Sequence, residues 1–267
     1  MSDTLLAPVL FLPHGGGPLP LLGEPSHKPF VDWLSTLAPN LPRPKAILVI
    51  SAHWETPVPS VTASEDPGIV HDYYGFPEAA YKIEYPVKGS PALSRTVIAL
   101  LKQQGMLAVQ DELRPLDHGV FVPLTLLYPN ADIPCVQLSL LDHLNPETHI
   151  ELGEALRELR KKGVLIIGSG LSFHNLKVFF DRQADGARGE QFDQWLTDTC
   201  CAPNHSYAAR CERLINWETA PEARYCHPRE EHLLPLHVCL GAGGDAPAEH
   251  VFSDYMLRQK VSGYLWR

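Results

Sequence analysis

Three histidines stand just beyond apolar segments that have the composition of buried strands. In α/β proteins the carboxyl ends of such strands meet along one edge of the sheet, and ligands bind there. Imidazole binds zinc, iron and copper, so three histidines in equivalent positions predict a metal site, whereas one alone would be interpreted as a hydrogen-bonded cap of its strand. The histidines are His14 after residues 8–12, His53 after residues 45–51 and His174 after residues 164–168.

His118 is a candidate for acid–base chemistry because it precedes a helical pattern over residues 119–128. A helix N-terminus lowers the pKa of a histidine and the adjacent Asp117 raises it, so this position suits proton transfer near neutral pH. The alternative is an ordinary helix start, with Asp117 as the N-cap and His118 exposed in the first turn.

His232 lies at the acidic start of a helical pattern over residues 229–240. This placement directs either His232 or a neighbouring carboxylate, Glu230 or Glu231, toward the metal site. The alternative is an amphipathic helix whose two glutamates simply face the positive end of its dipole. His237, five residues further on, would face elsewhere on a regular helix and is left out of the site.

Residues 71–77 form a loop that is rich in aromatic side chains, here called the aromatic loop. Its Tyr74 and Phe76 are candidates for substrate binding, because aromatic rings stack on aromatic ligands and a phenol adds a hydrogen bond. The alternative is a surface loop that its rings pin to the core. Other chemistries lack their signatures, since the sequence has no G-x-S-x-G motif and no phosphate-binding or dinucleotide-binding fingerprint.

The apolar pattern alternates between strands and helices, which predicts a single three-layer α/β catalytic domain over residues 1–267. We expect a mostly parallel or mixed central sheet, helices on both faces, and an active site at the carboxyl edge of the strands. Residues 201–227 have no clear period and are expected to hold an extra helix with a lid-like loop. Strands are expected at residues 8–12, 45–51, 133–139 and 164–168, and less clearly at 59–63, 248–253 and 260–266. Helices are expected at residues 28–38, 90–104, 119–128, 146–162, 188–200 and 229–240.

The net charge of −9 disfavours nucleic acid or an anionic membrane surface as the partner, because both select a basic face. A small molecule is the expected partner, and a homodimer is left open. The N-terminus has no signal-peptide pattern and no apolar run is long enough to span a membrane, so we expect a cytoplasmic protein. The six cysteines are expected to be reduced thiols, because their spacing does not suit a disulfide framework.

Six short motifs, taken together and in this order, resemble those of the DODA-type extradiol aromatic ring-opening dioxygenases. These enzymes belong to the class III, or LigB-like, superfamily, which includes 4,5-DOPA dioxygenases. Each tripeptide alone is weak evidence, but six in order over nearly the whole chain are specific. The motifs are Pro13-His14-Gly15-Gly16, Ser51-Ala52-His53-Trp54, Tyr74-Gly75-Phe76-Pro77, Asp117-His118-Gly119, Phe173-His174-Asn175-Leu176 and Glu231-His232-Leu233-Leu234-Pro235-Leu236.

The resemblance implies a non-haem metal site with His14, His53 and His232 as ligands. His174 matches a position that is either a fourth ligand or an inner-shell hydrogen-bonding residue, and His118 matches the acid–base histidine of the family. Many class III relatives use two histidines and a carboxylate, which keeps a glutamate next to His232 as the alternative third ligand.

The implied reaction inserts O2 into a DOPA-like catechol and gives a ring-opened semialdehyde. Fe(II) is the working metal that this chemistry implies, because three protein ligands leave open positions for the catechol oxygens and for dioxygen. Zn(II) can accompany the protein as purified, since it binds such sites more tightly than Fe(II). Two other functions fit the same histidines: a zinc-dependent hydrolase, and a Memo-like non-enzymatic protein that binds a metal or ligand. The aromatic loop favours an aromatic substrate.

Overall fold

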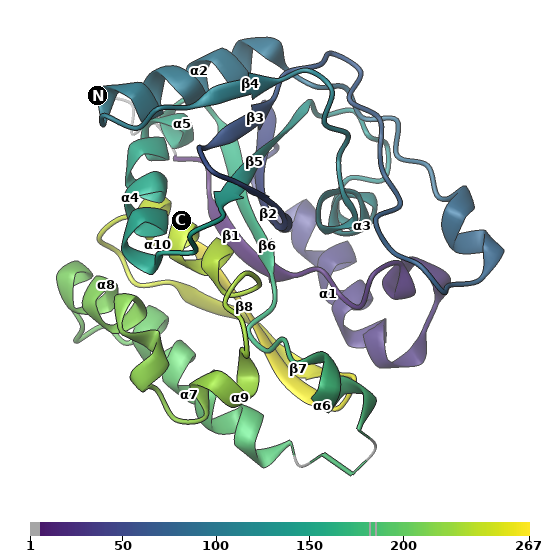
Figure 1. Ribbon diagram of the computed structural model, residues 1–267, viewed down its shortest axis with the longest axis vertical. Helices are drawn as coiled ribbons and strands as arrows, with labels where there is room; N and C mark the ends of the chain where they lie inside the picture. Colours follow the sequence, from purple (N-terminus) through teal and green to yellow (C-terminus); the bar gives the residue numbers. More distant parts are fainter. Residues whose placement is uncertain (1–5, 182, 185) are drawn as a thin grey trace.

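A computed structural model describes residues 6–181, 183–184 and 186–267. The described strands form one mixed sheet in the order β4-β3-β5-β2-β6-β1-β8-β7 (Figure 1). The strands at its centre are parallel. β2 pairs with β5 on one edge and with β6 on the other, and β1 pairs with the far edge of β6. The antiparallel strands β8 and β7 extend the sheet beyond β1. The strands are β1 (Val9–Pro13), β2 (Ala46–Thr56), β3 (Ser60–Thr62), β4 (Val109–Asp111), β5 (Cys135–Leu141), β6 (Val164–Gly170), β7 (Glu249–Met256) and β8 (Gln259–Trp266).

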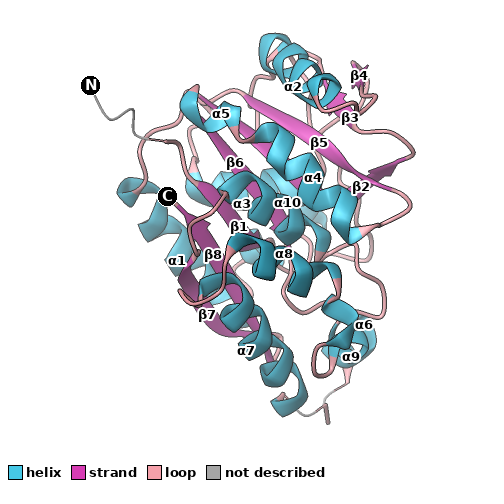
Figure 2. Cartoon of the chain, turned by 90° about the vertical axis from the view of Figure 1, so that its left-hand side faces the viewer, coloured by secondary structure: helices cyan, strands magenta, loops and turns pink. Residues whose placement is uncertain are grey.

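Helices cover both faces of this sheet, which is why its central strands are largely buried and mostly apolar (Figure 2). Alternate residues of β6 face the two helical layers: a Cβ at Gly168 would meet Pro235 of α10, while Ser169 donates a hydrogen bond to the Gly119 carbonyl of α3. The layer with α3 also contains α1, and the layer with α10 contains α4 and α7. The longer helices are α1 (Lys28–Leu37), α2 (Pro91–Gln103), α3 (His118–Leu127), α4 (Pro146–Leu156), α7 (Ala187–Cys201), α8 (Tyr207–Ile215) and α10 (Leu234–Gly243). The short ones are α5 (Glu158–Lys161), α6 (Leu176–Phe180) and α9 (Ala223–Cys226).

The expected three-layer α/β architecture with a mixed sheet is confirmed, and so are all the expected strands. Two helical predictions needed correction. The helix expected from residue 229 begins at Leu234, because a turn precedes it and Pro235 occupies its first turn. The helix expected over residues 146–162 is divided into α4 and α5. The sequence pattern missed β4 and α6, which are too short to show a period.

The segment over residues 201–227 contains α8 and α9, so the extra helix expected there is confirmed, while its lid-like role stays a prediction. All six cysteines are free thiols, as expected. Within the described part of the chain, no helix is both long enough and apolar enough to cross a membrane.

Candidate functional site

His14 lies one residue beyond β1, where its backbone N–H still donates to the Gly170 carbonyl at 3.1 Å. Its Nδ1 lies 3.2 Å from Ser169 Oγ, so its Nε2 is the nitrogen left for a ligand. Gly15 follows with a φ of +88°, and a Cβ there would lie 2.5 Å from Pro20 Cγ. This turn therefore requires glycine, which explains why a residue without a side chain directly follows His14.

An irregularity within β2 positions His53. The expectation that the strand ends before this histidine is wrong, because β2 continues to Thr56. The pairing of β2 with β5 shifts its register between Ile50 and Glu55, and His53 lies in that interval. Such bulges turn side chains away from their regular direction. The Nε2 atoms of His53 and His14 lie 3.1 Å apart, so both rings present a nitrogen to the same point.

His118 is the first residue of α3, and its ring centroid lies 3.9 Å from that of His53 and 5.4 Å from that of His14. Its Nδ1 lies 2.8 Å from Oδ1 of Asp72, a residue of the aromatic loop. The same oxygen accepts a hydrogen bond from the backbone N–H of His118 at 3.0 Å. The carboxylate that contacts His118 is therefore Asp72.

Asp117, which the sequence places beside His118, turns into the core instead. Its buried carboxylate accepts hydrogen bonds from Ser51 Oγ, at 2.7 Å, and from Gln137 Nε2. Its side chain makes no capping bond to α3, and His118 is buried. The alternative interpretation of this motif, an ordinary N-cap followed by an exposed histidine, is therefore wrong.

His232 reaches the site from the turn before α10. Its ring centroid lies 5.2 Å from that of His14 and 4.9 Å from that of His53. The His174 ring stacks on His232 with centroids 3.4 Å apart. Oε1 of Glu231 lies 2.8 Å from Nδ1 of His232 and 3.2 Å from Nδ1 of His174. One carboxylate oxygen thus orients both rings from behind, as the residues behind metal ligands commonly do.

Of the two glutamates considered as ligands, Glu231 lies at the site and Glu230 does not. Glu230 pairs with Arg224 at 2.6 Å. Burial by itself would raise the pKa of Glu231, but its hydrogen bond from His174 and the charge of Arg229 outweigh that effect and lower the pKa. Glu231 is therefore ionised at neutral pH.

Burial lowers the pKa of His14, His53 and His232 well below the ordinary value, and the neighbouring histidines lower it further. These three imidazoles are therefore neutral at neutral pH. A neutral imidazole has a free lone pair on one nitrogen, which is what a metal ligand needs.

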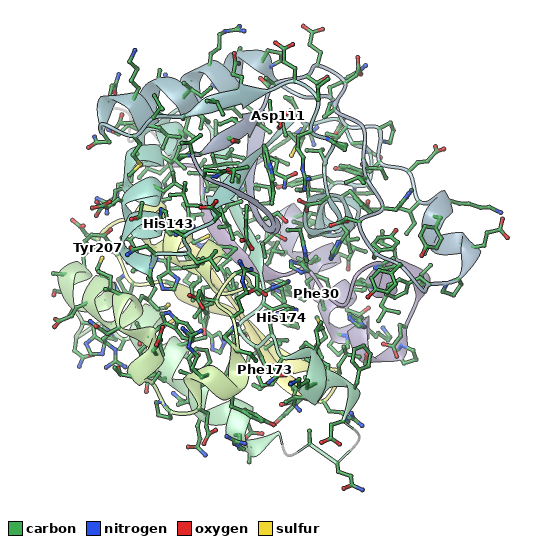
Figure 3. The ribbon with its side chains drawn as sticks, in the orientation of Figure 1. Phe30, Asp111, His143, Phe173, His174 and Tyr207 are labelled. Carbon is green, nitrogen blue, oxygen red and sulfur yellow. The ribbon has the colours of Figure 1, made fainter. Side chains whose placement is uncertain are left out.

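Two groups of possible ligand atoms lie at this edge of the sheet, and within each group the atoms are no more than 4.8 Å apart. This supply of neutral imidazole nitrogens and an ionised carboxylate suits a divalent transition metal. The groups are His14, His53 and His118, and His174, Glu231 and His232. The expected ligand set of His14, His53, His232 and His174 is divided between them, so the choice of ligands stays a prediction. His174 lies two residues before the start of α6, beside the sheet (Figure 3).

Comparison with known proteins identifies the family. Residues 8–262 match the model of the LigB family, described as the catalytic LigB subunit of aromatic ring-opening dioxygenase. The chain belongs to the LigB family.

Curated relatives of this LigB-family chain match it along most of its length. It is 40% identical to a 4,5-DOPA dioxygenase extradiol of Beta vulgaris, over 91% of this chain and 90% of the relative. It is 35% identical to a protein of the same name from Escherichia coli K12, over 91% of this chain and 87% of the relative. It is 38% identical to a dioxygenase of Hapsidospora irregularis named tasH, over 98% of this chain and 86% of the relative.

A solved structure shares the fold. The crystal structure of an uncharacterized protein from Escherichia coli K12 matches with a TM-score of 0.78 and 28% identity, over 98% of this chain and all of the other. The resemblance to extradiol dioxygenases is thus confirmed at the level of the family, which the names of its relatives place in the extradiol dioxygenase class.

In this LigB-family chain the aromatic loop forms a wall beside His118. The ring centroid of Tyr73 lies 5.8 Å from that of His118, and the Tyr73 and Phe76 rings make an edge-to-face contact with centroids 5.4 Å apart. Phe76 also borders Gly17, in the turn after the first histidine. Tyr74 is 91% exposed. Of the two expected substrate-binding residues, Phe76 therefore lies near the site and Tyr74 faces solvent, and their role in binding stays a prediction.

A cavity of about 260 Å³ opens beside His174 and Glu231, slightly below the usual size range for small-molecule sites. Arg229 at its rim is already held by Glu55, through two bonds of 2.5 and 2.6 Å. Lys177, by contrast, has no ion-pair partner among the described residues. The cavity is lined by His174, Asn175, Leu176, Lys177, Pro228, Arg229 and Glu231.

Buried histidines outside the site bond to the backbone, as structural histidines do. His27 Nε2 accepts from the Gly16 N–H at 3.0 Å, and His149 Nε2 accepts from the Leu141 N–H at 3.1 Å. His237, which was left out of the site, is buried with its Nε2 2.9 Å from a backbone carbonyl of α8.

Sequence reasoning missed three residues that hold the site histidines: Ser169 behind His14, Asp72 behind His118, and the bridging role of Glu231. An acidic residue inside an aromatic loop was the one local signal for Asp72. No spacing in the sequence connects it to a histidine 46 residues later.

Proposed function

We propose that this chain is an Fe(II)-dependent extradiol dioxygenase, which uses O2 to open the ring of a DOPA-like catechol and gives a ring-opened semialdehyde. The observation that carries the proposal is the gathering of five histidine rings at the carboxyl edge of a LigB-type sheet. The names of the plant and bacterial relatives support DOPA as the substrate to test first.

His14, His53 and His232 would hold the metal. Their depressed pKa values keep them neutral, and Nδ1 of His14 and of His232 is occupied by Ser169 and Glu231. Fe(II) bound there supplies the open coordination positions and the redox chemistry that insertion of dioxygen needs.

His118 would move the substrate proton. Its Nδ1 is bonded to Asp72, so Nε2 is free to accept a proton from a catechol hydroxyl and to return it later in the reaction. His174 would stabilise the negative charge that develops on oxygen when both of its ring nitrogens carry a proton, because Nδ1–H then donates to Glu231 and Nε2–H is left to donate to the substrate.

The aromatic loop would close the site on the side of His118. Tyr73 holds its hydroxyl on the Ala80 carbonyl at 2.7 Å, and burial raises its pKa to about 12. Tyr73 therefore stays neutral and acts as an apolar wall against the substrate ring, which excludes water from the proton transfer.

The test is reconstitution of the metal-free protein with Fe(II) under anaerobic conditions, followed by DOPA, protocatechuate and catechol in air. We expect oxygen uptake and a yellow product with at least one of these substrates. His53→Ala should abolish both, whereas His143→Ala, a change at an exposed histidine outside the site, should leave them intact.

The same experiment, repeated with Zn(II), a panel of esters and amides and no oxygen, separates the two alternatives. A zinc-dependent hydrolase would be active with Zn(II) in the absence of oxygen. A Memo-like binding protein would hold the metal and turn over none of the three catechols. Silence of the Fe(II)-loaded protein across a wide catechol panel, with the metal bound, would contradict the proposal.

A further inference from the structure

Asp72 makes two hydrogen bonds to a single residue. Its Oδ1 lies 2.8 Å from Nδ1 of His118 and accepts from the backbone N–H of His118 at 3.0 Å. The Asp72 side chain is 22% exposed, and that of His118 is 8% exposed. Both hydrogen bonds of this carboxylate oxygen, which belongs to the aromatic loop, therefore go to the first residue of α3.

The backbone bond supplies a cap that α3 otherwise lacks. The first N–H groups of a helix have no partner within it, and the side chain of the preceding residue usually accepts from them. Asp117 holds that position but makes no such bond, because its carboxylate is bonded to Ser51 and Gln137 in the core. Asp72 provides the acceptor from another part of the chain.

The side-chain bond determines which nitrogen of His118 carries the proton. A neutral imidazole has one N–H, and a carboxylate beside Nδ1 keeps the proton there, which leaves the lone pair on Nε2. The two bonds to Asp72 also fix the position of the ring, which lies between His53, at 3.9 Å, and Tyr73, at 5.8 Å.

We propose that Asp72 is the positioning residue of His118: it orients the imidazole and holds its proton on Nδ1, so that Nε2 is the acceptor presented to the substrate. The effect on turnover rests on the proposed function, whereas the position of the ring proton does not. The rival explanation is that Asp72 only caps α3 and contributes to stability.

Asp72→Asn separates these two roles, because asparagine retains an oxygen that can cap the helix but loses the charge that holds the ring proton. We expect kcat with DOPA to fall about 10- to 100-fold, the range found when a residue that orients a metal-binding histidine is replaced. KM and metal content should stay close to those of the wild type, and the thermal midpoint should fall by only a few degrees, because the neutral amide oxygen still accepts both bonds. Asp66→Asn is the matched control, because Asp66 is an exposed neighbour that pairs with Lys88. This change should leave kcat unaltered.

A second readout does not depend on activity. ¹⁵N NMR of the full-length, Zn(II)-loaded protein with ¹⁵N-labelled histidine reports which ring nitrogens are protonated, and His118→Ala identifies the signals of His118. The wild type should show a protonated Nδ1 and an unprotonated Nε2, and Asp72→Asn should move part of the population to the other tautomer.

Three results would overturn the inference: a wild-type His118 protonated on Nε2, an Asp72→Asn variant with unchanged kcat and tautomer, or a loss of kcat that only follows losses of stability and metal. If the wild type turns over no catechol, the proposed function fails, and the NMR result still decides the role of Asp72.

Discussion

Replacing Glu231 by glutamine should weaken metal binding, even though glutamate and glutamine have nearly the same shape. Oε1 of Glu231 holds Nδ1 of His232 at 2.8 Å and Nδ1 of His174 at 3.2 Å, and the carboxylate is ionised at neutral pH because its pKa is lowered. An amide oxygen can still accept both bonds, but it carries no charge.

The size of the effect follows from the two bonds. A hydrogen bond to a charged group is worth about 1.5–3 kcal/mol and a neutral one about 0.5–1.5 kcal/mol, so each bond loses roughly 1 kcal/mol. The pair together loses at most about 2 kcal/mol of metal-binding free energy, because part of this cost is already present before the metal binds, and this corresponds to a metal affinity up to about 30-fold lower. That value lies within the range of about 10- to 100-fold found for residues behind metal ligands.

The assay is a competition titration of Zn(II) between the protein and a chelator of known affinity. Glu230→Gln is the matched control, because Glu230 is the adjacent residue but pairs with Arg224, outside the site. Equal affinities for Glu231→Gln and the wild type, or an equal loss in Glu230→Gln, would refute the reasoning. A loss far above about 100-fold would instead identify the Glu231 carboxylate as a direct ligand.

Three further predictions concern the proton acceptor, the cavity and acid stability. His118→Ala should reduce turnover by roughly 10²-fold or more with unchanged metal content, and normal kinetics in this variant would remove His118 from the mechanism. Lys177→Glu should raise KM for DOPA and protocatechuate, which carry a carboxylate, more than KM for catechol. The reason is that Lys177 lines the cavity without an ion-pair partner among the described residues, so its ammonium group can pair with a substrate carboxylate. Equal changes in KM for all three substrates would argue against this pairing. Burial lowers the pKa of His149 from the ordinary value of about 6.5 to about 4. As the pH falls below about 6.5, the unfolded state therefore binds a proton that the folded state does not, and stability is lost between that pH and about 4. This histidine should account for roughly 2 kcal/mol of lost stability by pH 5, measured by urea unfolding, and His149→Gln should lose correspondingly less than the wild type between pH 7 and pH 5.

The sheet and most of its helices could be predicted from the sequence, because buried parallel strands leave long apolar runs and amphipathic helices leave a period. The same reasoning drew attention to His14 and His174, since strand ends meet at one edge of a sheet. For His53 the residue was identified correctly, but the end of its strand was not, because no local sequence pattern predicts the register shift between Ile50 and Glu55.

The residues that hold the histidines could not be predicted, since they come from distant parts of the chain. Asp72 and His118 are 46 residues apart, and Ser169 and His14 are 155 apart. Adjacency pointed to Asp117 as the partner of His118, but a competing set of buried hydrogen-bond donors draws that carboxylate into the core. Such competition is a property of the packed structure and leaves no trace in local spacing.

The most direct test of the central claim is to measure where the oxygen goes. The Fe(II)-loaded protein would be given DOPA under ¹⁸O₂, with oxygen uptake recorded against DOPA consumed and the product examined by mass spectrometry. An extradiol dioxygenase consumes one O₂ for each DOPA and places ¹⁸O in the new carboxyl group of a ring-opened product. A product that forms without oxygen uptake, or whose new oxygen comes only from water, would contradict the account.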